Sequence, residues 1–209
     1  MPKTSTAPSR REERRLVHQD LSRQQLLDSA EEVFGDKGFH ETTLKEIAEL
    51  AEFSVGSVYL FFESKDELFR QVFVRRGEQF IPALHGILDD QDADPVAQLH
   101  ALVDFVVEFF RRHPRFGRLY FRYENATRHS AAREIDVVMR IQASLFERGQ
   151  RAGSFHEGDP SVLARLFSGL MSAYQAFDSA FVSDDGGDME RLPLTNLHNL
   201  VARAFVVDS

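Results

Sequence analysis

The segment from Thr43 to Leu68 constrains the fold of this chain more than any other part of the sequence. Thr43 and Glu46 have the spacing of a capping box, in which side chains at the N-cap and N3 positions satisfy free backbone amides. The apolar residues that follow recur at helical spacing, as Leu44, Ile47, Ala48 and Ala51. The sequence therefore predicts a short helix that begins at Thr43.

A second short helix is expected after a turn at Glu52-Phe53, with Ser54 as its N-cap. Its apolar face would carry Val58, Phe61 and Phe62, and Ser64 with Glu67 forms the capping box of a third helix. Helices of about two turns are marginal on their own. Such a pair serves better to present one helix to a groove, although an ordinary helical hairpin inside a larger bundle is the alternative.

Several residues of this segment have the chemistry that contact with nucleic acid requires. Gly56 is unfavourable inside a helix unless something must approach the backbone closely, and a DNA phosphate is one such group. Hydroxyl and ammonium donors suited to phosphate are available on Ser54, Ser57, Tyr59 and Lys65.

The string Ser-x-Gly-Ser-Val-Tyr-x-x-Phe-x-Ser-Lys-x-Glu-Leu at residues 54–68 resembles the helix-turn-helix of TetR-family transcriptional regulators. The resemblance covers about residues 20–80 in one ungapped register and includes Ala30, Phe34, Gly38, Phe39 and Thr42-Thr43. It implies an N-terminal three-helix DNA-binding domain, a C-terminal helical bundle for ligand binding and dimerisation, and a dimer that sets two recognition helices in successive major grooves.

The chain also departs from the family pattern. Glu52-Phe53 stands where a Gly-Val turn is common, Val55 where a basic residue is frequent, and Phe61 where a tyrosine is frequent. Leu60 occupies a position that often carries a polar or aromatic base-reading side chain, and a leucine can at most contact a thymine methyl. We therefore expect modest direct specificity, with DNA shape supplying the remainder.

We expect DNA to contact both helices of the motif. Tyr59 and Lys65 would contact phosphate, Ser57 with Thr43 and Lys45 would read bases, and Val55 and Leu60 would offer apolar contact. The complete predicted DNA-binding set is Thr43, Lys45, Ser54, Val55, Gly56, Ser57, Tyr59, Leu60 and Lys65.

The rest of the chain predicts an all-α protein, since no segment alternates with period two over a useful length. Residues 1–20 read as a flexible arginine-rich arm, 21–65 as the DNA-binding domain with its motif at 43–62, and 66–209 as the ligand-binding and dimerisation domain. Ser22 with Gln25 would cap the first helix. Later helices are expected at 65–81 (closed by Pro82), 95–112, 114–126, 131–152, 160–182 and 194–207.

The amino-acid composition excludes several kinds of site. The 209 residues contain no cysteine, so disulfides, thiolate metal sites and cysteine nucleophiles are absent. The net charge of −8 is unusual for a DNA-binding protein, but phosphate responds to local charge, and Arg10, Arg11, Arg14, Arg15 and Arg23 cluster near the first helix. Whether this arm contacts DNA or is a disordered solubilising leader is left open.

No apolar run is long enough to span a membrane and the N-terminus is polar, so a cytoplasmic protein is expected.

The histidines give no metal or catalytic pattern. None of the eight forms an i, i+4 pair, and neither a Gly-x-Ser-x-Gly nor a phosphate-loop motif occurs. We therefore expect no catalytic residues, no metal and no cofactor, and a protein that is not an enzyme.

The 19 phenylalanines indicate a small-molecule site within the C-terminal bundle. Most must fill the core, but rigid rings often leave apolar cavities with a few polar groups. The predicted ligand-binding residues are Phe109, Arg122, Tyr123, Phe146 and Tyr174. Arg118 or Arg122 could hold an anionic head group, Asp104, Glu108 and Glu124 leave a cation open, and a solid core without a cavity is the alternative.

The last two predicted helices carry more apolar surface than one packed face needs, which favours a homodimer interface. The predicted interface residues are Phe167, Leu170, Phe177, Phe181, Leu197, Leu200 and Val201. The alternative is that these helices are buried within their own subunit.

The sequence thus favours a homodimeric regulator of transcription, most simply a repressor that a small, largely apolar ligand releases from a near-palindromic operator. The competing interpretation is a small helical enzyme or ligand carrier with a vestigial helix-turn-helix. The identity of the ligand, the operator sequence, the regulated genes, and repression as opposed to activation do not follow from the sequence.

Overall fold

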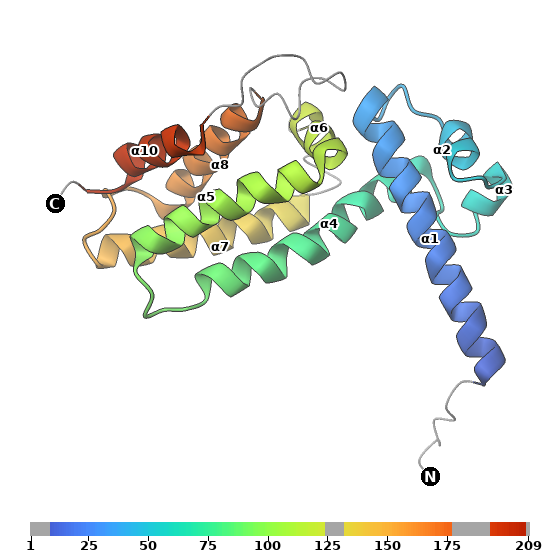
Figure 1. The fold of residues 1–209 in the computed structure, drawn as a ribbon, viewed down its shortest axis with the longest axis horizontal. Helices are drawn as coiled ribbons and strands as arrows, with labels where there is room; N and C mark the ends of the chain where they lie inside the picture. The colour runs from blue at the N-terminus through green and yellow to red at the C-terminus, as the bar shows by residue number, and fades with distance from the viewer. Residues whose placement is uncertain (1–8, 124–131, 177–192, 208–209) are drawn as a thin grey trace, which may run out of the picture. The chain divides into compact units, whose positions relative to one another are not determined.

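The computed structural model describes residues 9–123, 132–176 and 193–207, with side chains from 9–120, 135–176 and 193–207. Within these ranges the secondary structure is helical apart from one isolated bridge between Phe155 and Val206, which confirms the all-α fold class. The helices, shown in Figure 1, are α1 (Arg10–Lys37), α2 (Leu44–Leu50), α3 (Val55–Val58), α4 (Lys65–Leu88), α5 (Pro95–Arg112), α6 (Pro114–Tyr123), α7 (Ala132–Arg151), α8 (Pro160–Ala176) and α10 (Leu194–Phe205).

The chain divides into two compact units, residues 1–72 and 73–209. The division falls inside α4, after Val72, whereas the sequence places the domain boundary after residue 65. One continuous helix therefore contributes its first two turns to the first unit and the rest to the second.

Aromatic packing holds the first unit together. α1 packs on α2, and α2 packs on α3. Phe34 of α1 meets Phe69 of α4 edge-on with ring centroids 5.1 Å apart, and Phe39 packs 4.9 Å from the same ring. Gly38 ends α1 with a φ of 86°, a conformation that favours glycine, and so turns Phe39 back onto this cluster.

The second unit is a helical bundle in which α7 packs on α8, and α5 packs on α6, α7 and α8. A second aromatic cluster joins α7, α10 and the segment that precedes α8. The ring of Phe146 on α7 lies 5.6 Å from that of Phe155 and 5.2 Å from that of Phe205 on α10. Phe155 needs a glycine beneath it, since a Cβ at Gly149 would lie 2.0 Å from its ring. The bridge from Phe155 to Val206 then fixes the chain that follows α10.

The start of the first helix differs from the prediction. The sequence predicts an N-cap at Ser22, but α1 begins at Arg10, where Ser9 and Glu12 form a complete capping box. Residues 10–21 are exposed, so they bury no apolar face whose periodicity would reveal a helix. The part of the predicted arm from residue 10 onward is therefore helical.

Other helix boundaries also differ from those predicted. α4 continues through Pro82 to Leu88, because buried Leu84 and Leu88 hold its last turns while Pro82 is exposed. α3 is a single turn ending at Val58, although two turns were expected. α10 ends at Phe205, since Val206 is extended in its bridge. Residues 177–182 and 124–126, predicted as helix ends, lie outside the described residues.

The turn between α2 and α3 is made without glycine. Glu52 has a φ of 60°, and among the described non-glycine residues it alone has a positive φ. The backbone N–H of Phe53 donates to the carbonyl of Ala48 at 2.8 Å, which closes the end of α2. A side chain in this left-handed conformation is strained.

We predict that Glu52→Gly raises the free energy of unfolding by about 0.5–1 kcal/mol, because relief of the strain exceeds the entropy that glycine adds to the unfolded chain. Denaturant unfolding measures the change. Glu49→Gly is the matched control within α2 and should lower the free energy by about 1 kcal/mol. A loss of stability for Glu52→Gly would show that the Glu52 side chain itself stabilises the turn.

Candidate DNA-binding surface and ligand cavity

The helices α2 and α3 are held by caps at one end and by a buried apolar face. The Thr43 side chain accepts from the N–H of Glu46 at 3.2 Å, and a Glu46 carboxylate oxygen accepts in return from the N–H of Thr43 at 2.9 Å. Ser54 caps α3 by accepting from the N–H of Ser57 at 3.0 Å. Ile47 and Val58 are fully buried beneath these caps, so both helices are fixed in orientation.

Most of the predicted DNA-binding residues share the exposed side of this pair. Tyr59 is 56% exposed. Leu60 is 83% exposed, so most of its apolar side chain is in contact with water. Ser57 is half-buried, with its Oγ 2.8 Å from that of Ser54. The remaining exposed members are Thr43, Lys45, Ser54, Val55 and Gly56.

Gly56 is not required by the packing of this chain. A Cβ built there would meet only the Ser54 Oγ, at 3.7 Å, which is an ordinary contact. Space on this side of α3 therefore remains open for a group from outside the chain.

Lys65 is placed differently from the expectation of a phosphate contact. Its ammonium donates to the carbonyls of Phe39 and Thr42, each at 2.9 Å, and lies 4.4 Å from the centre of the Phe39 ring. These contacts tie the first residue of α4 to the connection between α1 and α2. Lys65 thus acts within the unit as a clamp, with at most one proton left for a phosphate.

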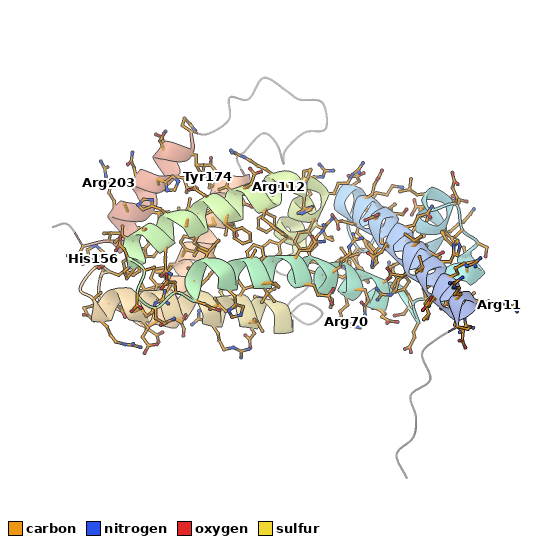
Figure 2. All side chains as sticks on the ribbon, turned by 60° about the horizontal axis from the view of Figure 1, so that its bottom comes forward. Arg11, Arg70, Arg112, His156, Tyr174 and Arg203 are labelled. Carbon is orange, nitrogen blue, oxygen red and sulfur yellow. The ribbon has the colours of Figure 1, made fainter. Side chains whose placement is uncertain are left out.

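The arginines of α1 fall into two groups. Arg23 is engaged internally, since it donates to Gln71 Oε1 at 2.6 Å and stacks 5.2 Å over the Phe62 ring. Arg10, Arg11, Arg14 and Arg15 are exposed on the first turns of α1. Figure 2 labels Arg11 there.

The second unit contains a cavity of about 90 Å³. Phenylalanine rings from α4, α5 and α6 form much of its wall, and α7 and α8 close the opposite side. The apolar lining residues are Phe73, Phe80, Ile81, Val106, Phe109, Phe110, Phe116, Ile135, Val138, Met139, Phe167 and Met171. Pockets that hold drug-sized ligands measure about 300–1,000 Å³, so a cavity of this size accepts roughly one ring unless its walls move.

Its polar lining is small and concentrated on two helices. Ser168, Ser172 and Gln175 follow at helical spacing on one face of α8, and Gln142 faces them from α7. Ser168 Oγ donates to Gln142 Oε1 at 2.9 Å. Gln175 is only 1% exposed, and neither polar atom of its amide has a hydrogen-bond partner among the described residues.

The cavity contains only part of the predicted ligand-binding set. Phe109 lines it, whereas Phe146 lies in the neighbouring aromatic cluster. Tyr174, labelled in Figure 2, is buried on α8 with its hydroxyl 3.5 Å from an Arg111 nitrogen, outside the lining. The side chains of Arg122 and Tyr123 lie outside the described residues.

Sequence reasoning missed Ser168, Ser172 and Gln175. A recognisable signal was present, because three polar residues at spacings of four and three lie on one face among the many apolar residues of this helix. Arg118, one of the two arginines that could hold an anion, is half-buried and absent from the lining, and Arg122 lies outside the described side chains; among the described lining residues, Arg76 is charged.

The predicted dimer residues also divide by burial. Phe167, Leu197 and Val201 are buried within their own unit, Leu170 is half-buried, and Leu200 is 50% exposed. Phe177 and Phe181 lie outside the described residues. Two further apolar side chains of α8 are exposed, Val162 at 43% and Leu166 at 58%.

No group of three or more potential metal-ligating side chains comes together in the parts of the chain that the structure describes. No described helix is both long enough and apolar enough to cross a membrane.

Two family models match the chain in the same order as its two units. The model for bacterial regulatory proteins of the tetR family matches residues 26–72, and that for the tetracyclin repressor-like C-terminal domain matches residues 92–175. Together they cover more than half of the chain.

Several individual transcriptional regulators are also similar to this chain. The chain is 27% identical over 158 residues to the uncharacterised regulator YfiR of Bacillus subtilis, covering 72% of this chain and 76% of that one. It is 28% identical over 145 residues to the repressor NicS of Pseudomonas putida, covering 66% and 68%. A TetR-like regulator from Rhodococcus sp. RHA1 has a solved structure with a TM-score of 0.66 at 28% identity, covering 86% of this chain and 91% of that one.

The capped helix pair and the helical second unit therefore define a helix-turn-helix DNA-binding protein. With the matches to both family models, the chain belongs to the TetR family of transcriptional regulators.

We predict a specific pH dependence from the α2 cap. Hydrogen bonds from Lys37 and from Thr43 lower the pKa of Glu46 from 4.5 to about 2. A carboxyl whose pKa is lower in the folded state stabilises the fold fully above about pH 4.5, and this contribution is lost as the pH falls through about 2. Glu46→Gln should therefore be less stable than the wild type at pH 7, with the difference shrinking below pH 4.5.

Urea unfolding of both proteins between pH 7 and pH 2.5 measures this difference. Glu49→Gln is the control, since it removes a carboxylate from the same helix whose ion pair with Lys45 is long, at 3.6 Å, and exposed. A constant difference between wild type and Glu46→Gln across this range would contradict the assignment.

Proposed function

We propose that this TetR-family regulator binds a near-palindromic operator as a homodimer and is a repressor released by a small, largely apolar ligand. The observation that carries the DNA-binding part is the exposed face of α2 and α3, where capped helices present Lys45, Ser54 and Tyr59 beside an open approach at Gly56. Hydroxyl and ammonium donors around accessible backbone suit a phosphate chain.

Base contacts are then few. The exposed apolar pair Val55 and Leu60 can contact thymine methyl groups, while Ser57 is already hydrogen-bonded to Ser54. A surface of this kind gives a sequence preference that depends partly on DNA shape. Repression is favoured over activation by the relatives named as repressors, NicS and the probable acrEF/envCD operon repressor of Escherichia coli, although FasR of Mycolicibacterium smegmatis is named an activator.

The exposed apolar side chains of α8 and α10 support a dimer. Val162, Leu166 and Leu200 would each bury apolar area against a second copy, and Val162 and Leu166 lie one turn apart on α8. A two-fold dimer places two recognition helices about 34–36 Å apart, so the operator half-sites would repeat after one turn of DNA.

Release would act through α4. This helix begins at the Lys65 clamp and lines the cavity from Phe73 to Ile81. A ligand that binds better when this wall has moved shifts the population toward that arrangement, and so changes how the same helix holds the connection between α1 and α2. The competing interpretation is a helical enzyme or carrier, which would bind or convert a ligand without binding DNA.

Selection of bound fragments from random duplex DNA tests the proposal. An enriched inverted repeat with half-sites one helical turn apart is the expected result, together with elution of that DNA as a complex with two protein chains. Failure to enrich any sequence, or a single unrepeated site, would refute the operator proposal.

We predict that Lys45→Ala and Tyr59→Phe weaken binding to operator and to unrelated DNA alike. Lys45, expected from the sequence to read bases, is assigned here to phosphate because its side chain is exposed while Lys65 is engaged within its own unit. Lys45→Ala should reduce the slope of log affinity against log salt by up to about 1, whereas Tyr59→Phe should leave the slope unchanged because tyrosine carries no charge. Leu60→Ala should instead lower the preference for operator by less than about tenfold, because an apolar contact discriminates less than a bidentate pair. Titrations at several salt concentrations separate the two effects. Leu50→Ala, at the exposed end of α2, is the matched control for the loss of a leucine.

We further predict that Leu166→Glu and Leu200→Glu convert the dimer to monomers, because each would bury an unpaired carboxylate in an apolar interface. Sedimentation at micromolar concentration measures the change, and operator affinity should fall with it. Val17→Glu introduces the same charge at a residue of α1 that is 58% exposed and should leave the dimer intact. A dimer that survives both substitutions would move the interface to another surface.

A further inference from the structure

Gln175 has an unusual state for a buried residue of this chain. Its side chain is 1% exposed and lines the cavity, yet both its Nε2 and its Oε1 lack a hydrogen-bond partner among the described residues. Buried amides are almost always hydrogen-bonded, so each exception needs an explanation, such as a bound water, ion or ligand.

Gln98 is the informative comparison, because it is a buried glutamine of the same unit with 5% exposure. Its Nε2 donates to the carbonyls of Ile87 and Asp90 at 3.0 and 2.9 Å, and its Oε1 accepts from Arg148. The bundle therefore can satisfy a buried glutamine completely where the residue is structural. Gln175 has the same chemistry and lines the cavity, but the described residues supply no partner for its amide.

The surroundings of Gln175 limit what could satisfy it. Among the described residues, the cavity lining contains no Asp or Glu, so these residues offer a bound cation no counter-charge. Arg76, the charged residue of this described lining, already donates to Gln79 Oε1 at 2.9 Å. An ionised carboxylate could accept from Gln175 Nε2 but would face the lone pairs of Oε1.

We propose that the cavity binds a neutral, largely aromatic or aliphatic molecule that carries an amide-type pair of donor and acceptor, and that this pair is held by Gln175. The ligand carbonyl accepts from Nε2, and the ligand N–H donates to Oε1. The polar stripe of α8 positions this end, while the rings of Phe109 and Phe116 cover the apolar end. This assignment rests on the proposed ligand site and names the class of ligand that it takes.

The volume of about 90 Å³ suggests a single ring as a first probe. Benzamide, benzoate, benzylammonium and toluene share that ring and differ in the polar group, so their relative affinities report what the polar end of the cavity accepts. Calorimetry and thermal shift on the protein of 209 residues, without DNA, give the comparison.

Benzamide should bind the wild type at least about tenfold more tightly than each of the other three, since one neutral hydrogen bond contributes roughly a factor of ten. Gln175→Leu should bind benzamide no better than toluene. Gln175→Glu should reverse the order in favour of benzylammonium, because the new carboxylate supplies the missing counter-charge.

Thermal unfolding of the variants without probe adds a second readout. Gln175→Leu should keep or raise the Tm, because it replaces an unsatisfied buried amide by an apolar group of similar size. Gln98→Leu should lower the Tm, because it leaves two carbonyls and Arg148 without their partner.

Equal binding of all four probes, binding of none, or a Gln175→Leu variant destabilised as much as Gln98→Leu would overturn the inference. Its failure is distinguishable from failure of ligand release. If benzamide shows the expected preference but leaves operator binding unchanged, the site assignment stands and the release mechanism falls. If another probe releases the operator without contacting Gln175, release stands and the assignment falls.

Discussion

Burial of phenylalanine rings is the interaction on which both units depend. The three helices that precede α4 include one of seven residues and one of four, and neither could persist in water alone. They are fixed because buried Ile47 and Val58 hold them against the rest of the unit, in which Phe34, Phe39 and Phe69 pack ring to ring between α1 and α4. In the second unit, Phe146 does the same for α8 and α10 through Phe167 and Phe205.

Phenylalanine rings also explain why the second unit contains a cavity. Flat, rigid side chains pack edge to face at preferred distances and adjust less than aliphatic ones do. Where Phe109, Phe110 and Phe116 converge from α5 and α6, the remaining space is closed by α7 and α8, which carry the polar groups. Phenylalanine therefore has two roles in this unit: it buries apolar area in the core, and it forms the rigid wall of the cavity.

Sequence reasoning succeeded where local chemistry decides the structure. The cap at Thr43 and the glycine end at Gly38 form as their residue types require. It failed where the signal is non-local or absent: the exposed start of α1 buries nothing that would show periodicity, and Pro82 is tolerated because Leu84 and Leu88 are buried beyond it. The cavity lining could be predicted only in part, since helical spacing does not say which of several apolar faces borders a void. Phe109 and Phe146 look alike in sequence, and only the first reaches it.

The proline in α4 has a mechanical consequence. Pro82 lacks the N–H that would bond to the carbonyl of Glu78, and so weakens the helix at one turn only. That turn contains Phe80 and Ile81, whereas Phe73, Arg76 and Gly77 line the cavity ahead of it. Bending is therefore easiest at the turn that Pro82 interrupts, toward the far end of the helix from Lys65. In the proposed release mechanism, the cavity wall on the Lys65 side of Pro82 would move as part of a more regular helix than the wall beside the proline.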